Sequence, residues 1–326
     1  MIIQRGISVW LGISFFISAV YHVEGSDRER PAGTGMNAIE SELDYYHNAI
    51  SLHVVQFANR LDEFFADDRI LEESDETLVK VTSSVNITEG RNPTFRISLR
   101  GRLALPHLEN RLQIFVDSLG ADRDLSEDLS TTPETTEEDK SLFTGMRFMA
   151  RETRRSRVSL DGGLRWRGGP VPFARIRGRR NFVMDPWLMR ITQSVFWFED
   201  RGFGETTRVD FDRWMHENLF FRSSSSATWS EASDGVEFDQ KLSLFQSVTY
   251  SKAVGISINA LGHTHPSTVI DEYGLIWRYR QRMHRDWLFV EAAPGLIFPR
   301  DENYEATPTA TLSIEAFFGN TKNLER

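Results

Sequence analysis

The 326-residue sequence contains no cysteine and only five lysines, so that 33 of its 38 basic residues are arginine. The absence of cysteine excludes a disulfide framework, a thiolate nucleophile and a cysteine-ligated metal. Phosphate-binding glycine loops are also missing, because Gly162-Gly163 and Gly168-Gly169 fit a strand kink and a hairpin turn. The arginine bias favours planar, bidentate pairing with carboxylates or phosphates.

Long apolar runs are scarce. Hydrophobic residues make up 40% of the chain, the mean hydropathy is -0.38 and the formal net charge is -9. These values exclude an α-helical membrane protein with many spans and argue against a nucleic-acid binder. They allow a membrane-spanning β-barrel, because each barrel strand is only half apolar.

The amino-terminal end has the pattern of a secretory signal. Arg5 precedes the apolar run Ile7–Val20, and Val23 and Gly25 fit the -3 and -1 positions of a cleavage site. The run is shorter than the roughly 20 residues of a membrane-spanning helix. We therefore predict a cleavable signal peptide over residues 1–25, followed by a flexible lead over 26–36.

A helical pattern then covers residues 37–66. Its apolar residues recur every three or four positions, at Leu43, Tyr46, Ile50, Val54, Phe57, Leu61 and Phe64. This spacing predicts an amphipathic periplasmic helix. Its apolar stripe either packs on the base of the following domain or serves as a plug or partner-binding helix.

From Thr77 onward the apolar period changes to two. In one segment Phe95, Ile97 and Leu99 alternate with Arg96 and Ser98, as in a half-buried strand. We predict fourteen strands, near 77–88, 94–105, 110–118, 142–151, 156–167, 171–180, 187–198, 205–214, 219–229, 236–249, 252–262, 269–283, 287–298 and 306–318. Twelve remains open if the serine-rich 219–229 segment is not a full span.

Strand length and loop length both favour a membrane barrel. Tilted transmembrane strands need about 9–11 residues, whereas strands of soluble sheets have about 5–6. Connections on one side are short, while longer ones, including the acidic segment 119–140, collect on the other. The expected fold class is all-β, a single transmembrane antiparallel up-and-down β-barrel over 77–318 with a tail over 319–326. A soluble β-sandwich array is the rival fold.

These features together resemble the outer-membrane β-barrel proteins of Gram-negative bacteria. The resemblance is architectural, covers residues 77–318, and rests on the signal peptide, the even strand number and the amphipathic last strand. It implies location in the bacterial outer membrane and a terminal assembly signal read by the barrel-assembly machinery. That signal maps onto Leu312, Ile314, Ala316 and Phe318, although Gly319–Arg326 extend beyond it.

Charged residues on the expected inward faces form the main candidate site. The arginine ladders are Arg96, Arg100 and Arg102; Arg175, Arg177 and Arg179; and Arg278, Arg280 and Arg282. The acidic residues able to pair with them include Asp210, Asp212, Glu237, Glu291 and Glu315. Such an interior is either a salt-bridged packing device or a charge-selective pore in which arginine favours anions.

His263-Thr264-His265-Pro266-Ser267 is the one local cluster that looks reactive. We interpret it as a turn, with Pro266 ending strand pairing, and predict neither a metal nor a catalytic role. Ser267, His263 and Asp271 nevertheless have the residue types of a barrel-embedded lipase.

The sequence therefore predicts a non-enzymatic, porin-like barrel, either a narrow pore or a structural membrane protein with a charged, arginine-rich lumen. An outer-membrane enzyme acting on lipid or peptide, and a surface-binding barrel using the loop 119–140, are the alternatives. No cofactor or nucleic acid is expected. The expected partners are outer-membrane lipid and lipopolysaccharide.

Overall fold

The computed structural model describes residues 77–105, 111–118, 141–153, 155–233, 235–283 and 287–319. The predicted signal peptide, flexible lead and 37–66 helix lie outside these ranges, as do segment 119–140 and residues 320–326. Within the ranges, no helix has the length and apolar character to cross a membrane.

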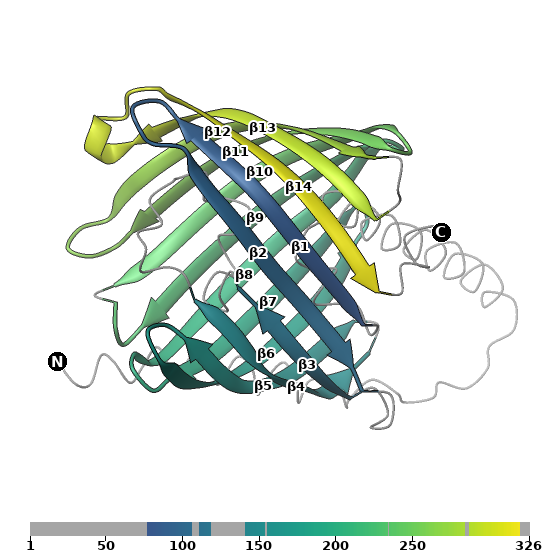
Figure 1. Cartoon of the computed structure of the whole chain (residues 1–326), viewed down its shortest axis with the longest axis vertical. Coiled ribbons are helices and arrows are strands. Elements are labelled where there is room, and N and C mark those ends of the chain that lie inside the picture. Colours follow the sequence, from purple (N-terminus) through teal and green to yellow (C-terminus); the bar gives the residue numbers. More distant parts are fainter. Residues whose placement is uncertain are drawn as a thin grey trace, which may run out of the picture. The chain divides into compact units, whose positions relative to one another are not determined.

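The described chain forms fourteen antiparallel strands, each paired with its neighbours in sequence (Figure 1). They are β1 (Leu78–Thr88), β2 (Thr94–Ala104), β3 (Leu112–Asp117), β4 (Leu142–Glu152), β5 (Ser156–Trp166), β6 (Pro170–Met184), β7 (Trp187–Phe198), β8 (Gly202–His216), β9 (Leu219–Ser230), β10 (Val236–Thr249), β11 (Lys252–His263), β12 (Val269–Arg282), β13 (Leu288–Pro299) and β14 (Thr307–Gly319). A short 3-10 turn, η4 (Arg300–Glu302), precedes β14. The prediction of an all-β, up-and-down barrel is confirmed.

The barrel closes where β1 pairs with β14, in a register that runs from Leu78 opposite Gly319 to Thr88 opposite Thr309. Closure leaves the sheet without a free edge strand. The serine-rich segment is a complete strand, β9, paired with β8 and β10 along its length. The count is therefore fourteen, and the twelve-strand alternative is wrong.

The two rims of the barrel differ in the length of their connections. At the rim where β1 begins and β14 ends, the terminal rim, two-residue turns join β6 to β7, β8 to β9 and β10 to β11. Connections at the other rim, the loop rim, include the long segment between β3 and β4 and the residues between β13 and β14. Short turns at one rim and longer loops at the other are typical of outer-membrane barrels, in which the short turns lie on the periplasmic side.

An ion pair ties two loop-rim connections together. Arg91, after β1, donates a hydrogen bond of 2.9 Å to Glu302 of η4. The hydrogen bond from the Thr307 hydroxyl and that from Arg91 hold the pKa of the Glu302 carboxyl below its ordinary value. The contact links the loops on either side of the β1–β14 closure.

The strands have one apolar and one polar face. On β2, Phe95 and Ile97 are 80% and 77% exposed in the isolated chain, whereas Ser98 and Arg102 are buried. Because successive side chains of a strand point to opposite faces, the buried polar residues lie on the inner face and the exposed apolar residues on the outer face. Such an inverted pattern suits a hydrocarbon surrounding, because lipid then covers the apolar side chains.

Glycines allow β4 and β5 to approach closely on the inner face. Gly145 lies opposite Gly163, and a Cβ added at Gly163 would fall 2.1 Å from the carbonyl oxygen of Thr144 and 2.6 Å from the Cα of Gly145. Both contacts are with backbone, which cannot rotate away.

We therefore expect Gly163→Ala to lower the free energy of unfolding by about 1–3 kcal/mol, as overpacking does elsewhere. Urea unfolding of the refolded protein measures the change. Gly169→Ala is the matched control, since its added Cβ would meet open space in the β5–β6 turn. Equal stability of the two variants would contradict the close approach.

Candidate functional site

The inner face carries many buried charged side chains. Nine are cationic: Arg102, Arg147, Arg165, Arg175, Arg177, Arg190, Arg222, Lys241 and Arg280. Six are acidic: Asp161, Asp210, Asp212, Asp239, Glu272 and Glu315. Cations thus outnumber anions among the buried residues, although the whole chain has a net charge of -9.

One carboxylate, that of Asp161 on β5, lies between two arginines. Arg147 on β4 donates two hydrogen bonds to it, with Nε–Oδ1 and Nη2–Oδ2 distances of 2.7 and 2.8 Å. Arg175 on β6 donates two more, of 3.0 and 2.7 Å, to Oδ2. The Asp161 side chain is fully buried. This cluster spans three neighbouring strands and contains two cations for one anion.

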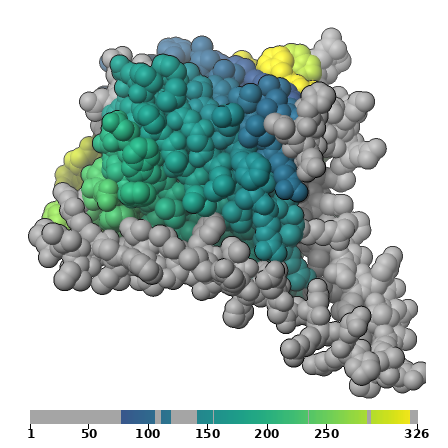
Figure 2. Space-filling view, turned by 90° about the horizontal axis from the view of Figure 1, so that it is seen from below, coloured from purple at the N-terminus to yellow at the C-terminus, as the bar shows by residue number. Residues whose placement is uncertain are grey.

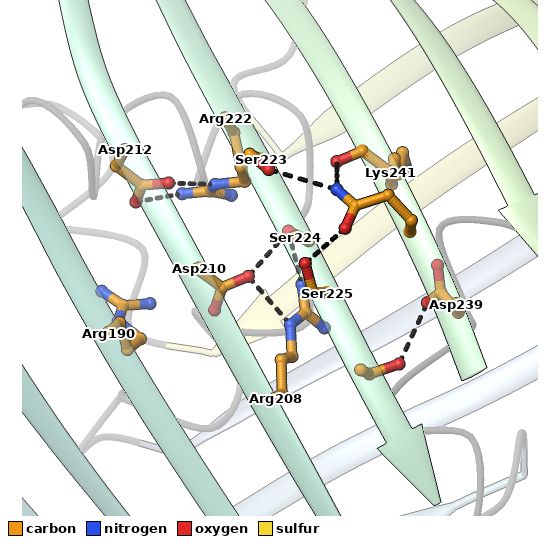
Figure 3. Close-up of polar contacts among 12 residues, drawn as sticks. Arg190, Arg208, Asp210, Asp212, Arg222, Ser223, Ser224, Ser225, Asp239 and Lys241 are labelled. Atoms are coloured by element: carbon orange, nitrogen blue, oxygen red, sulfur yellow. Dashed lines mark hydrogen bonds and ion pairs between the residues drawn. The ribbon is translucent and has the colours of Figure 1, made fainter. Parts of the chain in front are cut away.

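A second network joins β8 and β9, and Figure 3 shows it. Arg222 pairs with Asp212 through two hydrogen bonds of 2.8 and 3.0 Å. Asp210 accepts from both Arg208, at 3.0 Å, and the hydroxyl of Ser224, at 2.7 Å. These hydrogen bonds and ion pairs give the buried charged side chains the partners that buried ions require.

A third network spans the closure of the barrel. Arg280 on β12 is completely buried and pairs with Glu315 on β14, at 2.5 Å, and with Glu291 on β13, at 3.3 Å. Lys80 on β1 lies 3.4 Å from Glu315, and Arg278 lies 3.6 Å from Glu291. Three cations and two anions therefore join the first strand to the last three.

Buried aromatic rings accompany these charges. Phe143, Phe173 and Phe198 pack together on the inner face near the loop rim. The guanidinium of Arg165 lies 4.8 Å from the Phe198 ring centre, and that of Arg280 lies 4.6 Å from the ring centre of Phe289. Both distances suit cation–π contact, which helps to hold arginine away from water.

The predicted charged residues fall into three groups by burial. Arg102, Arg175, Arg177, Arg280, Asp210, Asp212 and Glu315 are buried, and Arg96, Arg100, Arg179, Arg278, Arg282 and Glu291 are half-buried. Glu237, the second residue of β10, is exposed at the loop rim. The structure brings Arg278, Arg280, Glu291 and Glu315 into one network and pairs Arg100 with Asp117 at 3.4 Å.

Sequence reasoning did not single out Asp161 or Arg147. Both lie on inward positions of predicted strands, so the period of two was an available signal. Their pairing could not be predicted from the sequence. Asp161 is 14 residues from each of Arg147 and Arg175, and the register between strands decides which side chains meet.

Two further candidates lie away from these networks. Leu312, Ile314 and Phe318 of the expected assembly signal are exposed on the outer face, and Ala316 is half-buried. At the loop rim, Nδ1 of His263 lies 2.6 Å from Oδ2 of Asp271, but the described residues supply no hydrogen bond from Ser267 to this pair. Among those same residues, no three His, Asp or Glu side chains have metal-binding geometry.

A closed antiparallel barrel with an apolar outer face and a charged inner face is the architecture of outer-membrane β-barrel proteins, and the described chain has this architecture. No protein-family model matches the sequence, and no curated protein is similar to it in sequence.

Solved structures with a similar fold include proteins described as outer-membrane proteins. A loop-deletion mutant of OmpT of Vibrio cholerae has 9% identity and a TM-score of 0.44, with 74% of this chain and 98% of that one covered. OccK2 of Pseudomonas aeruginosa has 7% identity and a TM-score of 0.44, with 75% and 98% covered. The channel DcaP of Acinetobacter baumannii has 9% identity and a TM-score of 0.42, with 74% and 96% covered.

Proposed function

We propose that this barrel is a narrow pore that favours anions. The observation that carries the proposal is the excess of cationic over acidic side chains buried on the inner face of a chain that is acidic overall. Arginine stays charged at every physiological pH, so its contribution does not titrate. Fixed positive charge along a pore raises the local anion concentration and repels cations.

Strand number supports a narrow passage. Barrels of about 8 strands have interiors filled by side chains, whereas those of about 16–18 leave a wide aqueous channel. Fourteen strands fall between these limits, and the arginine networks take up part of the interior. The expected conductance is therefore small.

Planar-bilayer recording of the refolded protein tests the proposal. In a salt gradient, the reversal potential should show a preference for chloride over potassium. Neutralising two inward arginines of β6, in the double variant Arg177→Gln/Arg179→Gln, should lower this preference, because both side chains lie on the inner face.

Arg180→Gln is the matched control. Arg180 lies on the same strand but on the outer face, where its guanidinium is 5.1 Å from the ring centre of Phe182. Its loss should leave the reversal potential unchanged. Zero conductance at all salt concentrations and voltages would contradict the pore and leave a structural barrel.

The outer face supports the proposed partners. Lipid and lipopolysaccharide would surround the apolar band, and the barrel-assembly machinery would bind β14, whose Leu312, Ile314 and Phe318 point outward. Stacking of Phe318 against Trp287 places aromatic side chains at the terminal rim, where outer-membrane barrels carry an aromatic girdle.

A further inference from the structure

The outer face of β7–β10 carries polar side chains well inside the strands. This outward polar cluster consists of Gln193 on β7, Glu205 and Thr207 on β8, Ser223 and Ser225 on β9, and Gln240 on β10. Strand alternation puts them on the outer face, because Ser194, Thr206, Ser224 and Lys241 are buried on the inner face. Gln193 is only 6% exposed, so neighbouring side chains of the outer face cover it.

The cluster consists of two hydrogen-bonded groups, one on β7 and β8 and one on β9 and β10. Gln193 lies opposite Thr207, and Ser225 lies opposite Gln240. The Thr207 hydroxyl donates to Oε1 of Gln193 at 2.6 Å. The amide of Gln240 donates to the Ser223 hydroxyl at 3.1 Å and accepts from Ser225, and Figure 3 shows both serines on β9 reaching toward β10.

The rest of the described outer face has a different character. Away from their ends, the outward positions of β11–β14 and β1–β6 hold apolar or aromatic residues, proline or glycine, apart from Ser83, Thr144 and Arg180. Figure 2 shows one side of the barrel, mostly in teal and green, with blue and yellow parts of the closure strands at one edge of the view. The polar residues are therefore concentrated on one side of the barrel.

Polar groups that face hydrocarbon are costly. Within the strand pairs some are satisfied, but Oε2 of Glu205 has no hydrogen-bond partner in the described chain. Lipid tails offer neither donors nor acceptors, so each unsatisfied group in the bilayer core costs several kcal/mol. Polar side chains in a membrane-facing position are therefore a signal of contact with protein rather than lipid.

We propose that this cluster is the surface through which two copies of the chain associate side by side in the membrane. Both copies cross the bilayer in the same direction, so each residue meets residues at its own depth in the partner. Serine, threonine and glutamine both donate and accept, which makes the cluster complementary to itself.

The surroundings of the cluster fit such a contact. Ala227 lies between Thr207 and Phe238 on the outer face, so a small residue adjoins the polar groups and lets a second backbone approach. Phe211 and Phe221 flank the cluster toward the terminal rim. Aromatic residues around a polar centre supply contact area for an interface.

The absence of cysteine permits a clean crosslinking test. Ala227→Cys places one thiol beside the cluster without altering it. In liposomes containing only the purified, folded protein, copper-phenanthroline oxidation should convert this variant largely into a disulfide-linked dimer.

Ala310→Cys is the matched control, because Ala310 is also an outward alanine and the fourth residue counted from the loop-rim end of its strand, but on β14. Its dimer yield should be severalfold lower. Equal yields from the two variants would overturn the proposal, because random collisions would account for both.

A second variant tests the polar groups themselves. Adding Ser223→Leu, Ser225→Leu and Gln240→Leu to Ala227→Cys should reduce dimer formation severalfold, while trypsin resistance and β-sheet circular dichroism confirm folding. An unchanged dimer yield in the folded variant would overturn the role of the cluster. Neither readout depends on conductance, so both are separate from the pore proposal.

Discussion

Asp161→Asn is expected to lower the free energy of unfolding by about 3–5 kcal/mol, the loss typical of breaking a buried ion pair by removing one partner. The carboxylate accepts four hydrogen bonds from Arg147 and Arg175 and is fully buried. Asparagine keeps the shape of the side chain but removes its charge. Two guanidinium groups would then lie close together without an anion between them.

Urea unfolding of the refolded protein in lipid vesicles, followed by the fluorescence of its eight tryptophans, measures the loss. Glu152→Gln is the matched control, since Glu152 pairs with Arg157 near the terminal rim and its side chain is 43% exposed. Exposed pairs contribute about 0.2–1 kcal/mol. If both variants lowered the free energy of unfolding by the same small amount, the buried network would not stabilise the barrel.

Most of the fold was predictable because its main signal is local. A period of two over more than ten residues identifies a strand and its apolar face without knowledge of its neighbours. The boundaries were less accurate where this signal fades. β6 was expected to end near residue 180 but continues to Met184, because the turn at Asp185-Pro186 needs only two residues. β8 begins at Gly202 instead of 205, because its connection to β7 needs only the three residues 199–201.

The candidate site was predictable only in part. The alternation places the arginine ladders on one face of each strand, but their partners depend on register and closure. Glu315 meets Lys80, which is 235 residues earlier in the chain, only because β14 pairs with β1. Contacts between residues so far apart in the sequence cannot be predicted from the apolar period of each strand. The sequence therefore indicates which residues are inside and not which of them pair.

The outward polar cluster explains why β9 was the weakest predicted strand. Serines occupy residues 223 to 226 continuously, so neither face of its centre is apolar. Ser224 bonds to Asp210 on the inner face, while Ser223 and Ser225 bond to Gln240 on the outer face. A strand with polar residues on both faces lacks the alternation that sequence analysis detects, and its pairing with β8 and β10 becomes visible only in the structure.

Ile314→Arg is expected to lower the free energy of unfolding in a bilayer by about 2–4 kcal/mol, the range for arginine at the lipid-facing midplane of a barrel. Ile314 lies near the middle of β14, is 53% exposed in the isolated chain, and has Ser83 and Val290 as its cross-strand neighbours. The reason is desolvation: hydrocarbon provides no partner for a guanidinium, and its side chain must bend far to reach water.

Ile87→Arg is the depth control. Ile87 is also outward and is 47% exposed, but it lies next to the loop-rim end of β1, where arginine costs about 0–1 kcal/mol. Refolding into phospholipid vesicles without assembly proteins separates this effect from the expected assembly signal on β14. A barrel surrounded by water would tolerate arginine equally at both positions, so a large loss at Ile314 together with a small one at Ile87 requires hydrocarbon around the middle of the barrel.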